Sequence, residues 1–220
     1  MDWEEGRWRQ YLWVYYRLIE RVDAQIGAIL QTLREVGQDD NTVVVFSSDH
    51  GDGAAAHRWN QKTLFYDEVA RVPFIVRPPA CAQAGLRDTS SLVNMNLDLF
   101  PTVYDCAGLP LPAGLAGRSV RPLVEGKPGA QGHPLVVSQN DMTTTKAASS
   151  GVFGRMLRTP RYKYVRFSAG EKREQFFDMT ADPGEMRDLV GRADHAAVLA
   201  DHRATLEAWM DQVGDTVMRG

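Results

Sequence analysis

The chain has 220 residues and a formal net charge of −3, with 44% hydrophobic and 24% charged residues. These values are ordinary for a globular protein that forms one large domain, or a large and a small one. The slight negative charge gives no reason to expect nucleic acid or an anionic membrane as a partner. No apolar run approaches the roughly 18 residues that a membrane-spanning helix needs.

Apolar residues recur at steps of three and four through residues 8–36, which predicts one long amphipathic helix. Gly37 is well placed to end it in a left-handed cap. The helix would be roughly 40 Å long. We expect it to pack on a sheet, because a strand follows after a short turn, with a coiled-coil seam as the alternative.

Residues 42–46 are β-branched or aromatic, which predicts a fully buried strand of a parallel sheet. In open α/β sheets, ligands bind beyond the carboxyl ends of the strands, and Asp49 and His50 emerge at such an end. A carboxylate and an imidazole side by side indicate a metal site. The alternative is an aspartate that caps the next turn and a histidine satisfied by local hydrogen bonds.

The following elements are a loop at 53–60, a short helix at 61–69, a strand at 72–77 and a helix at 96–107. Residues 113–132 are rich in Gly and Pro and mark a domain edge. Cys81 and Cys106 have neither metal nor disulfide spacing, so we interpret them as buried thiols.

Residues 131–220 show a different pattern of predicted elements, mostly short strands. We predict strands at 135–138, 151–158, 162–167 and 175–179, a turn at 182–185 and a closing amphipathic helix at 193–218. The fold class is thus α/β, with a parallel layer in residues 1–130 followed by a small antiparallel sheet and one helix in residues 131–220. Five basic residues alternate along two of these strands and are interpreted as a solvated sheet face, or as a surface for a polyanionic substrate: Arg155, Arg158, Arg161, Lys163 and Arg166.

Several segments, in order from about Tyr15 to Leu189, resemble the sulfatase family of the alkaline-phosphatase-like superfamily. The N-terminal ones are Val22-Asp-Ala-Gln-Ile-Gly27, Asn41-Thr-Val-Val-Val-Phe-Ser-Ser-Asp-His-Gly-Asp52 and Lys62-x-x-x-Tyr66-Asp-Glu68-x-x-Arg71-Val-Pro73. The C-terminal ones are Arg158-Thr-Pro-Arg-Tyr-Lys-Tyr164, Phe177-Asp178, Asp182-Pro-Gly-Glu185 and Asp188-Leu189.

The resemblance implies roles for individual residues. It makes Asp49 and His50 the second pair of metal ligands, with Ca²⁺ expected and Mn²⁺ or Mg²⁺ as alternatives. It makes Lys62 a contact of the substrate sulfate, and His57 a sulfate contact or a proton donor to the leaving alcohol. The simpler alternatives are a solvated lysine and a structural loop histidine. Asp52 is expected to be a turn residue or a support for the ligands rather than a ligand.

The segment Asn140-Asp-Met-Thr-Thr-Thr-Lys146 matches a region that often forms the substrate rim in this family. The family's nucleophile is a formylglycine made from a Cys/Ser-x-Pro-x-Arg motif, and neither Cys81, Cys106 nor any serine here fits that motif. The resemblance therefore implies a truncated C-terminal half, with formylglycine and another metal-binding pair expected in the missing N-terminal half.

The fold implied is part of an alkaline-phosphatase-like parallel or mixed sheet with flanking helices, followed by a small C-terminal α+β subdomain. The function implied is metal-dependent hydrolysis of a sulfuric ester, an aryl or carbohydrate sulfate. The compartment stays open: the sequence shows no signal peptide, and the resemblance is compatible with a periplasmic or extracellular location for an intact family member. Two alternatives stay open: an inactive remnant or partner-dependent subunit, and a phosphonate or phosphodiester hydrolase. We expect no turnover by this chain alone, and association into homo-oligomers through surfaces exposed by truncation.

Overall fold

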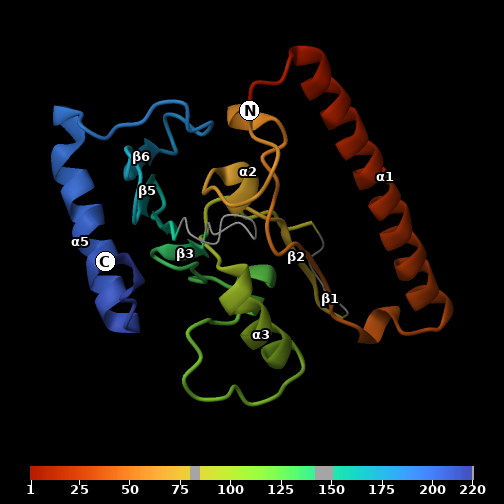
Figure 1. The fold of residues 1–220 in the computed structure, drawn as a ribbon. Helices are drawn as coiled ribbons and strands as arrows, with labels where there is room; N and C mark the ends of the chain where they lie inside the picture. Colours follow the sequence, from red (N-terminus) through yellow and green to blue (C-terminus); the bar gives the residue numbers. More distant parts are fainter. Residues whose placement is uncertain (80–84, 142–150, 220) are drawn as a thin grey trace. The chain divides into compact units, whose positions relative to one another are not determined.

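The computed structural model of the protein describes residues 1–79, 85–141 and 151–219 (Figure 1). They divide between two units, which we describe in turn. The first contains Met1–Lys62, Arg71–Thr89 and Val93–Gly132, and the second contains Thr63–Ala70, Ser90–Leu92 and His133–Gly220. No helix in these described ranges has both the length and the apolar character needed to cross a membrane.

The first unit begins with helix α1, Glu5–Glu35, which confirms the predicted long helix. Gly37 adopts a φ of 68° and donates its N–H to the carbonyl of Arg34, so the predicted glycine cap is also confirmed. A 3₁₀ turn, Asp39–Asn41, leads into strand β1, Val44–Ser47.

Strand β1 pairs with β2, Phe74–Arg77, and the pairing is antiparallel, with Val44 opposite Arg77 and Ser47 opposite Phe74. The predicted parallel pairing is therefore wrong for these strands. Full burial is wrong too, because Phe46 is 39% exposed and Ile75 is 58% exposed. An apolar run indicates a strand that can be buried on both faces, but this two-stranded sheet has nothing to cover both faces within the described part of its unit.

None of the residues of α1 is buried. Ile19, Val22 and Ile29 on its apolar stripe are exposed, so the expected packing on a sheet is not observed in the described residues. The lengths of the elements explain why α1 is not buried against β1 and β2. A 31-residue helix is about 46 Å long, whereas the four-residue strands β1 and β2 span only about 13 Å.

The rest of the first unit is built around α3, Met95–Cys106, which agrees with the predicted helix, and the short α4, Arg121–Val124. The Asp98 carboxylate is fully buried and accepts N–H groups from Asn94 and Arg118, which fixes the chain that follows α3. Cys106 is only partly buried, and burial raises the pKa of its thiol. Cys81 lies outside the described residues.

The second unit contains a four-stranded antiparallel sheet in the order β3-β4-β5-β6, which confirms the predicted strands. The strands are Val136–Asp141, Phe153–Arg158, Tyr162–Phe167 and Glu174–Asp178. The closing helix is α5, Ala196–Val213, with the 3₁₀ turns Ala193–His195 before it and Val217–Arg219 after it. The antiparallel sheet and closing helix agree with the α+β prediction for this region.

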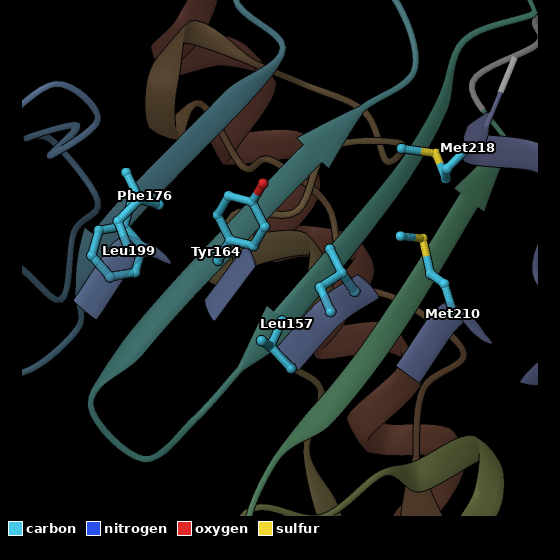
Figure 2. Close-up of a cluster of buried hydrophobic side chains, with 7 residues drawn as sticks. Leu157, Tyr164, Phe176, Leu199, Met210 and Met218 are labelled. Atoms are coloured by element: carbon cyan, nitrogen blue, oxygen red, sulfur yellow. The ribbon is translucent and has the colours of Figure 1, made fainter. Parts of the chain in front are cut away.

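One face of this sheet packs against α5. Leu157 lies opposite Tyr164, and Tyr164 lies opposite Phe176, so the three side chains share a face. Figure 2 shows them beside Leu199 and Met210 of α5. Leu157, Phe176 and Leu206 are completely buried, and this cluster is the core of the unit.

The other face is covered by residues 63–70, which contain only a four-residue helix, α2, Asp67–Ala70, in place of the helix predicted at 61–69. Phe65 packs there with Met156 and Val165. The extended backbone before α2 uses its carbonyl groups to meet the sheet: Lys163 Nζ donates to Phe65 O at 2.9 Å, and Asn140 Nδ2 donates to Thr63 O at 2.5 Å.

The predicted solvated basic face is wrong for two of its five residues. Lys163 is 1% exposed and forms ion pairs with Asp67 at 2.5 Å and Glu185 at 2.8 Å. Arg155 is buried on the α5 side and pairs with Asp215. Both faces of the sheet are covered, so alternation along the strands places these charges inside and requires partners for them. Arg161, in contrast, has a side chain that is 60% exposed.

Candidate metal and sulfate site

The predicted site lies in the first unit, immediately after β1. Asp49 is largely exposed, and its Oδ1 accepts the backbone N–H of His50 at 3.0 Å. This hydrogen bond, followed by the charges of His50 and Lys62, lowers the pKa of Asp49. The carboxylate is therefore ionised at neutral pH, and its Oδ2 is turned toward the imidazole of His50.

His50 has one ring nitrogen engaged and the other directed at Asp49. Nδ1 lies 2.7 Å from the carbonyl oxygen of Gly51, which can only accept, so Nδ1 carries a proton whether the ring is neutral or charged. Nε2 lies 3.5 Å from Asp49 Oδ2, and in the neutral ring its lone pair is available to a metal ion. A histidine that donates one N–H to a backbone carbonyl is the usual arrangement of a metal ligand.

A second Asp-His pair in the chain makes a useful comparison. At Asp194-His195, Nδ1 of the histidine lies 3.1 Å from the carboxylate, which Arg192 also approaches at 3.4 Å. That carboxylate is already neutralised by a guanidinium. The sequence pattern Asp-His alone therefore does not create a pair of open donors, but the local backbone at 49–51 does.

Two donors are fewer than a complete metal site requires, since Ca²⁺ takes six to eight oxygen ligands and Mg²⁺ six. No group of three or more His, Cys, Asp or Glu side chains in the described ranges is arranged to hold a metal. Asp49 and His50 thus fit a divalent metal as part of a larger ligand set.

The loop that follows carries the other two predicted residues, His57 and Lys62. It is unusual in its backbone, because four residues other than glycine have positive φ: Ala54, Ala55, His57 and Arg58, at 46°, 70°, 50° and 53°. Such conformations are strained for L-residues and cluster at functional sites. The carbonyl of Lys62 accepts a hydrogen bond from Trp59 Nε1 at 3.1 Å, which closes the end of the loop.

Asp52 forms the start of this loop. Its Oδ1 accepts the N–H of Ala54 at 2.8 Å, a local turn that confirms its predicted role as a turn residue. The same oxygen accepts a hydrogen bond from the hydroxyl of Tyr11 on α1. Sequence reasoning missed Tyr11, although Trp8, Tyr11 and Tyr15 form an aromatic row at helical spacing.

The predicted substrate rim at residues 140–146 falls mostly outside the described residues. Within it, Asn140 and Asp141 belong to β3, and Asn140 holds the carbonyl of Thr63.

Comparison with known proteins identifies the family. Residues 55–212 match the family described as N-sulphoglucosamine sulphohydrolase, C-terminal, which is most of the chain. The chain belongs to the sulfatase family. Two curated relatives from Bacteroides thetaiotaomicron are a Delta 4,5-hexuronate-2-O-sulfatase, 36% identical, and an N-acetylglucosamine-6-O-sulfatase, 32% identical. The alignments cover 97% and 95% of this chain but only 44% and 37% of those sulfatases.

Solved structures agree. A "2-O GAG sulfatase" superimposes with a TM-score of 0.89 at 35% identity, over 97% of this chain and 46% of that one. A protein solved in complex with its substrate D-glucosamine-2-N,6-O-disulfate matches with a TM-score of 0.78 at 30% identity, over 90% and 40%. The phosphonate monoester hydrolase of Agrobacterium radiobacter matches with a TM-score of 0.78 at 28% identity, over 90% and 41%. The sulfatase chain described here spans less than half the length of each.

Proposed function

We propose that this chain is part of a metal-dependent sulfuric ester hydrolase, in which Asp49 and His50 bind the metal and Lys62 and His57 bind the sulfate group. The observation that carries the proposal is the pair of open donors beyond β1: an ionised carboxylate and an imidazole Nε2 that lie 3.5 Å apart. The backbone N–H of His50 is the main cause of the lowered pKa of Asp49, and the charge of Lys62 adds the smallest contribution, which is consistent with a common site.

A divalent cation at these donors would draw negative charge from sulfate oxygens, and the sulfatase family generally uses such an ion. The hard oxygen of Asp49 suits Ca²⁺, which we propose, over Mn²⁺ or Mg²⁺. Lys62 supplies a flexible ammonium that can neutralise a sulfate oxygen. His57 either binds the sulfate or protonates the leaving alcohol, because an imidazole ring can donate a hydrogen bond or a proton.

We propose a carbohydrate sulfate as substrate, because the relatives named above act on sulfated sugars according to their names. Hydrolysis of a phosphonate monoester is the second candidate, favoured by the similarity to the Agrobacterium enzyme. We also propose the division into a larger α/β part, residues 1–130, of alkaline-phosphatase type, and a small C-terminal part, residues 131–220.

The 220 residues contain no Cys/Ser-x-Pro-x-Arg motif for a formylglycine nucleophile. We therefore expect this chain alone to turn over neither an aryl sulfate nor a phosphonate monoester. Aryl sulfate hydrolysis that disappears in Asp49→Ala would overturn the expected inactivity. Hydrolysis of the phosphonate alone would favour the second candidate.

Metal binding can be tested on the chain as it is. A Ca²⁺ titration followed by the amide signals of residues 49–51 in NMR spectra should show saturable shifts with a dissociation constant on the order of millimolar, because two donors form only part of a site. Asp49→Ala should abolish the shifts. Mn²⁺ should broaden the same signals selectively.

The pair Asp194-His195 provides the matched control. Asp194→Ala removes another exposed Asp-His carboxylate, which Arg192 already neutralises, and should leave Ca²⁺ binding unchanged. Equal shifts at 49–51 and at 194–195, or no shifts at either, would contradict a specific metal role for Asp49 and His50.

A further inference from the structure

The hydrogen bond between Tyr11 and Asp52 joins two segments that lie 41 residues apart in the sequence. Tyr11 is on α1, and Asp52 opens the loop that ends at Lys62. The Tyr11 hydroxyl also lies 3.5 Å from the carbonyl of Asn60, near the other end of the loop. One phenol thus touches both the beginning and the end of the segment that carries His57.

The loop keeps its shape through backbone hydrogen bonds and through its contact with Tyr11. Its four strained residues favour other backbone conformations, so the loop persists only where its contacts over-determine it. Backbone bonds from Gly53 to Gln61 and from Ala55 to Trp59 bring its two sides together. Their register depends on the turn at Asp52, where Ala54 N–H donates to the oxygen that Tyr11 also contacts.

The two sides of the loop pack closely at Gly53 and Trp59, so the backbone there has little room to move. A Cβ on Gly53 would lie 2.7 Å from the carbonyl oxygen of Trp59, so the two sides of the loop touch directly. A shift of Asp52 must therefore move the segment from Gly53 to Trp59. The direction in which His57 points follows that movement, because its φ of 50° belongs to the strained turn.

We propose that Tyr11 is a positioning residue of the sulfate site: through Asp52 it holds the loop that presents His57 and Lys62. The inference rests on the proposed function, in which those two residues bind sulfate. The ring of Tyr11 packs against the rings of Trp8 and Tyr15, at centroid distances of 6.1 and 6.2 Å. These contacts restrict the position of the Tyr11 hydroxyl. Burial and the bond to Asp52 raise the pKa of Tyr11, so the phenol keeps its proton at neutral pH.

The loop is tested first by amide hydrogen exchange on the whole 220-residue chain. Tyr11→Phe keeps the ring contacts and removes only the hydroxyl. We expect the amides of Gly53 and Ala55 to exchange at least about tenfold faster, with no change in the amides of β5 in the other unit. Tyr16→Phe is the matched control, because Tyr16 lies on the same helix with its side chain turned to solvent.

A conservative change provides a rescue. Asp52→Asn retains an oxygen that can accept from both Tyr11 and Ala54, so the loop amides should keep most of their protection, whereas Asp52→Ala should lose it as Tyr11→Phe does. Equal exchange in Tyr11→Phe and Tyr16→Phe would overturn the proposal. So would a rise in exchange throughout the unit, which would indicate a general structural role.

The link to sulfate is measured with inorganic sulfate as the probe and the ring proton signals of His57 as the readout. Tyr11→Phe should weaken sulfate binding at least about threefold at an unchanged unfolding midpoint, while Tyr16→Phe binds as the wild type does.

Lys62→Ala and His57→Ala test the proposed function separately, with the second followed through the amide of Lys62. If neither changes sulfate binding while Tyr11→Phe still loosens the loop, the proposed function fails and the loop assignment stands. If sulfate affinity is the same in Tyr11→Phe and wild type, the positioning role fails.

Discussion

Helices α1 and α5 carry the same kind of apolar stripe and differ completely in what the stripe does. α5 buries Leu199, His202, Leu206 and Met210 against its sheet, whereas α1 buries no residue along its whole length. The two helices differ in the size of the sheet that their own unit provides for packing. The second unit offers α5 a four-stranded sheet, while the first has only two short strands in its described part. An apolar stripe thus shows that a helix can be buried along one side, not that it is buried.

Asp49 of the first unit and Lys163 of the second differ in the same way, one being exposed and the other buried. The first unit holds its candidate site in the open, with an Asp49 side chain that is 82% exposed. The second unit buries Lys163 and Glu185 completely and joins them to Asp67, whose N–H donates to Glu185 at 2.6 Å. Burial raises the pKa of Glu185, and the charge of Lys163 acts in the opposite direction. Lys163 and Glu185 thus serve the structure of the second unit, whereas the Asp49 carboxylate of the first unit is open to a ligand.

The largest expected effect comes from removing the buried cation. Lys163→Met leaves two carboxylates without their partner and frees the carbonyl of Phe65. Losing one member of a buried ion pair costs about 3–5 kcal/mol. Native-state hydrogen exchange of the β5 amides measures the free energy of opening of this unit alone.

Lys172→Met is the control for that experiment, because Lys172 is exposed in the same unit. It should change the opening free energy by less than about 0.5 kcal/mol. A loss below about 1 kcal/mol in Lys163→Met would show that the charges are not essential for holding residues 63–70 on the sheet.

The two helices can be compared directly by leucine truncation. Leu206→Ala in α5 removes a completely buried side chain and should cost about 2–5 kcal/mol. Leu18→Ala in α1 removes a side chain that is exposed and should change stability by less than about 0.5 kcal/mol. Hydrogen exchange in each helix gives both values. Similar losses at the two sites would show that α1 is covered in solution, for example by a second copy of the chain.

The sequence was a good guide to the second unit, because its signals are local. Alternating strands, the turn at Asp182 and the closing helix each depend on neighbouring residues, and all of them formed. The burial of Lys163 could not be read in the same way. It depends on residues 63–70, nearly a hundred positions away, lying on the second face of the sheet. That contact also explains why only Asp67–Ala70 became helical, since the preceding carbonyls bond to side chains of the sheet.

The candidate site was predictable in part for the same reason. Asp49 and His50 stand out because they follow an apolar strand, and their open donors depend on adjacent backbone atoms. Nothing in the local pattern connects Tyr11 with Asp52, because tertiary structure alone brings them together. The antiparallel pairing of β1 with β2 escaped prediction likewise, since an apolar run does not specify the direction of its neighbour.

The smallest of the expected effects concerns the pH dependence of the stability of the second unit. The guanidinium of Arg155 donates hydrogen bonds to Asp215 and lowers its pKa, and both side chains are buried. A carboxylate with a lowered folded pKa stabilises the fold fully above its unfolded pKa of about 3.9, and this stability is lost as the pH falls through the folded value.

Asp215→Asn should therefore cost about 1.5–3 kcal/mol at pH 7, the range for a hydrogen bond to a charged group, and progressively less below about pH 4. Urea unfolding of both proteins between pH 7 and pH 3, followed by β5 exchange or by circular dichroism, measures the difference. Asp201→Asn on the exposed surface of α5 removes the same charge without a buried partner and serves as the control. A difference between Asp215→Asn and wild type that stays constant with pH would mean that packing of Asp215, rather than its ionised pairing with Arg155, stabilises the end of α5.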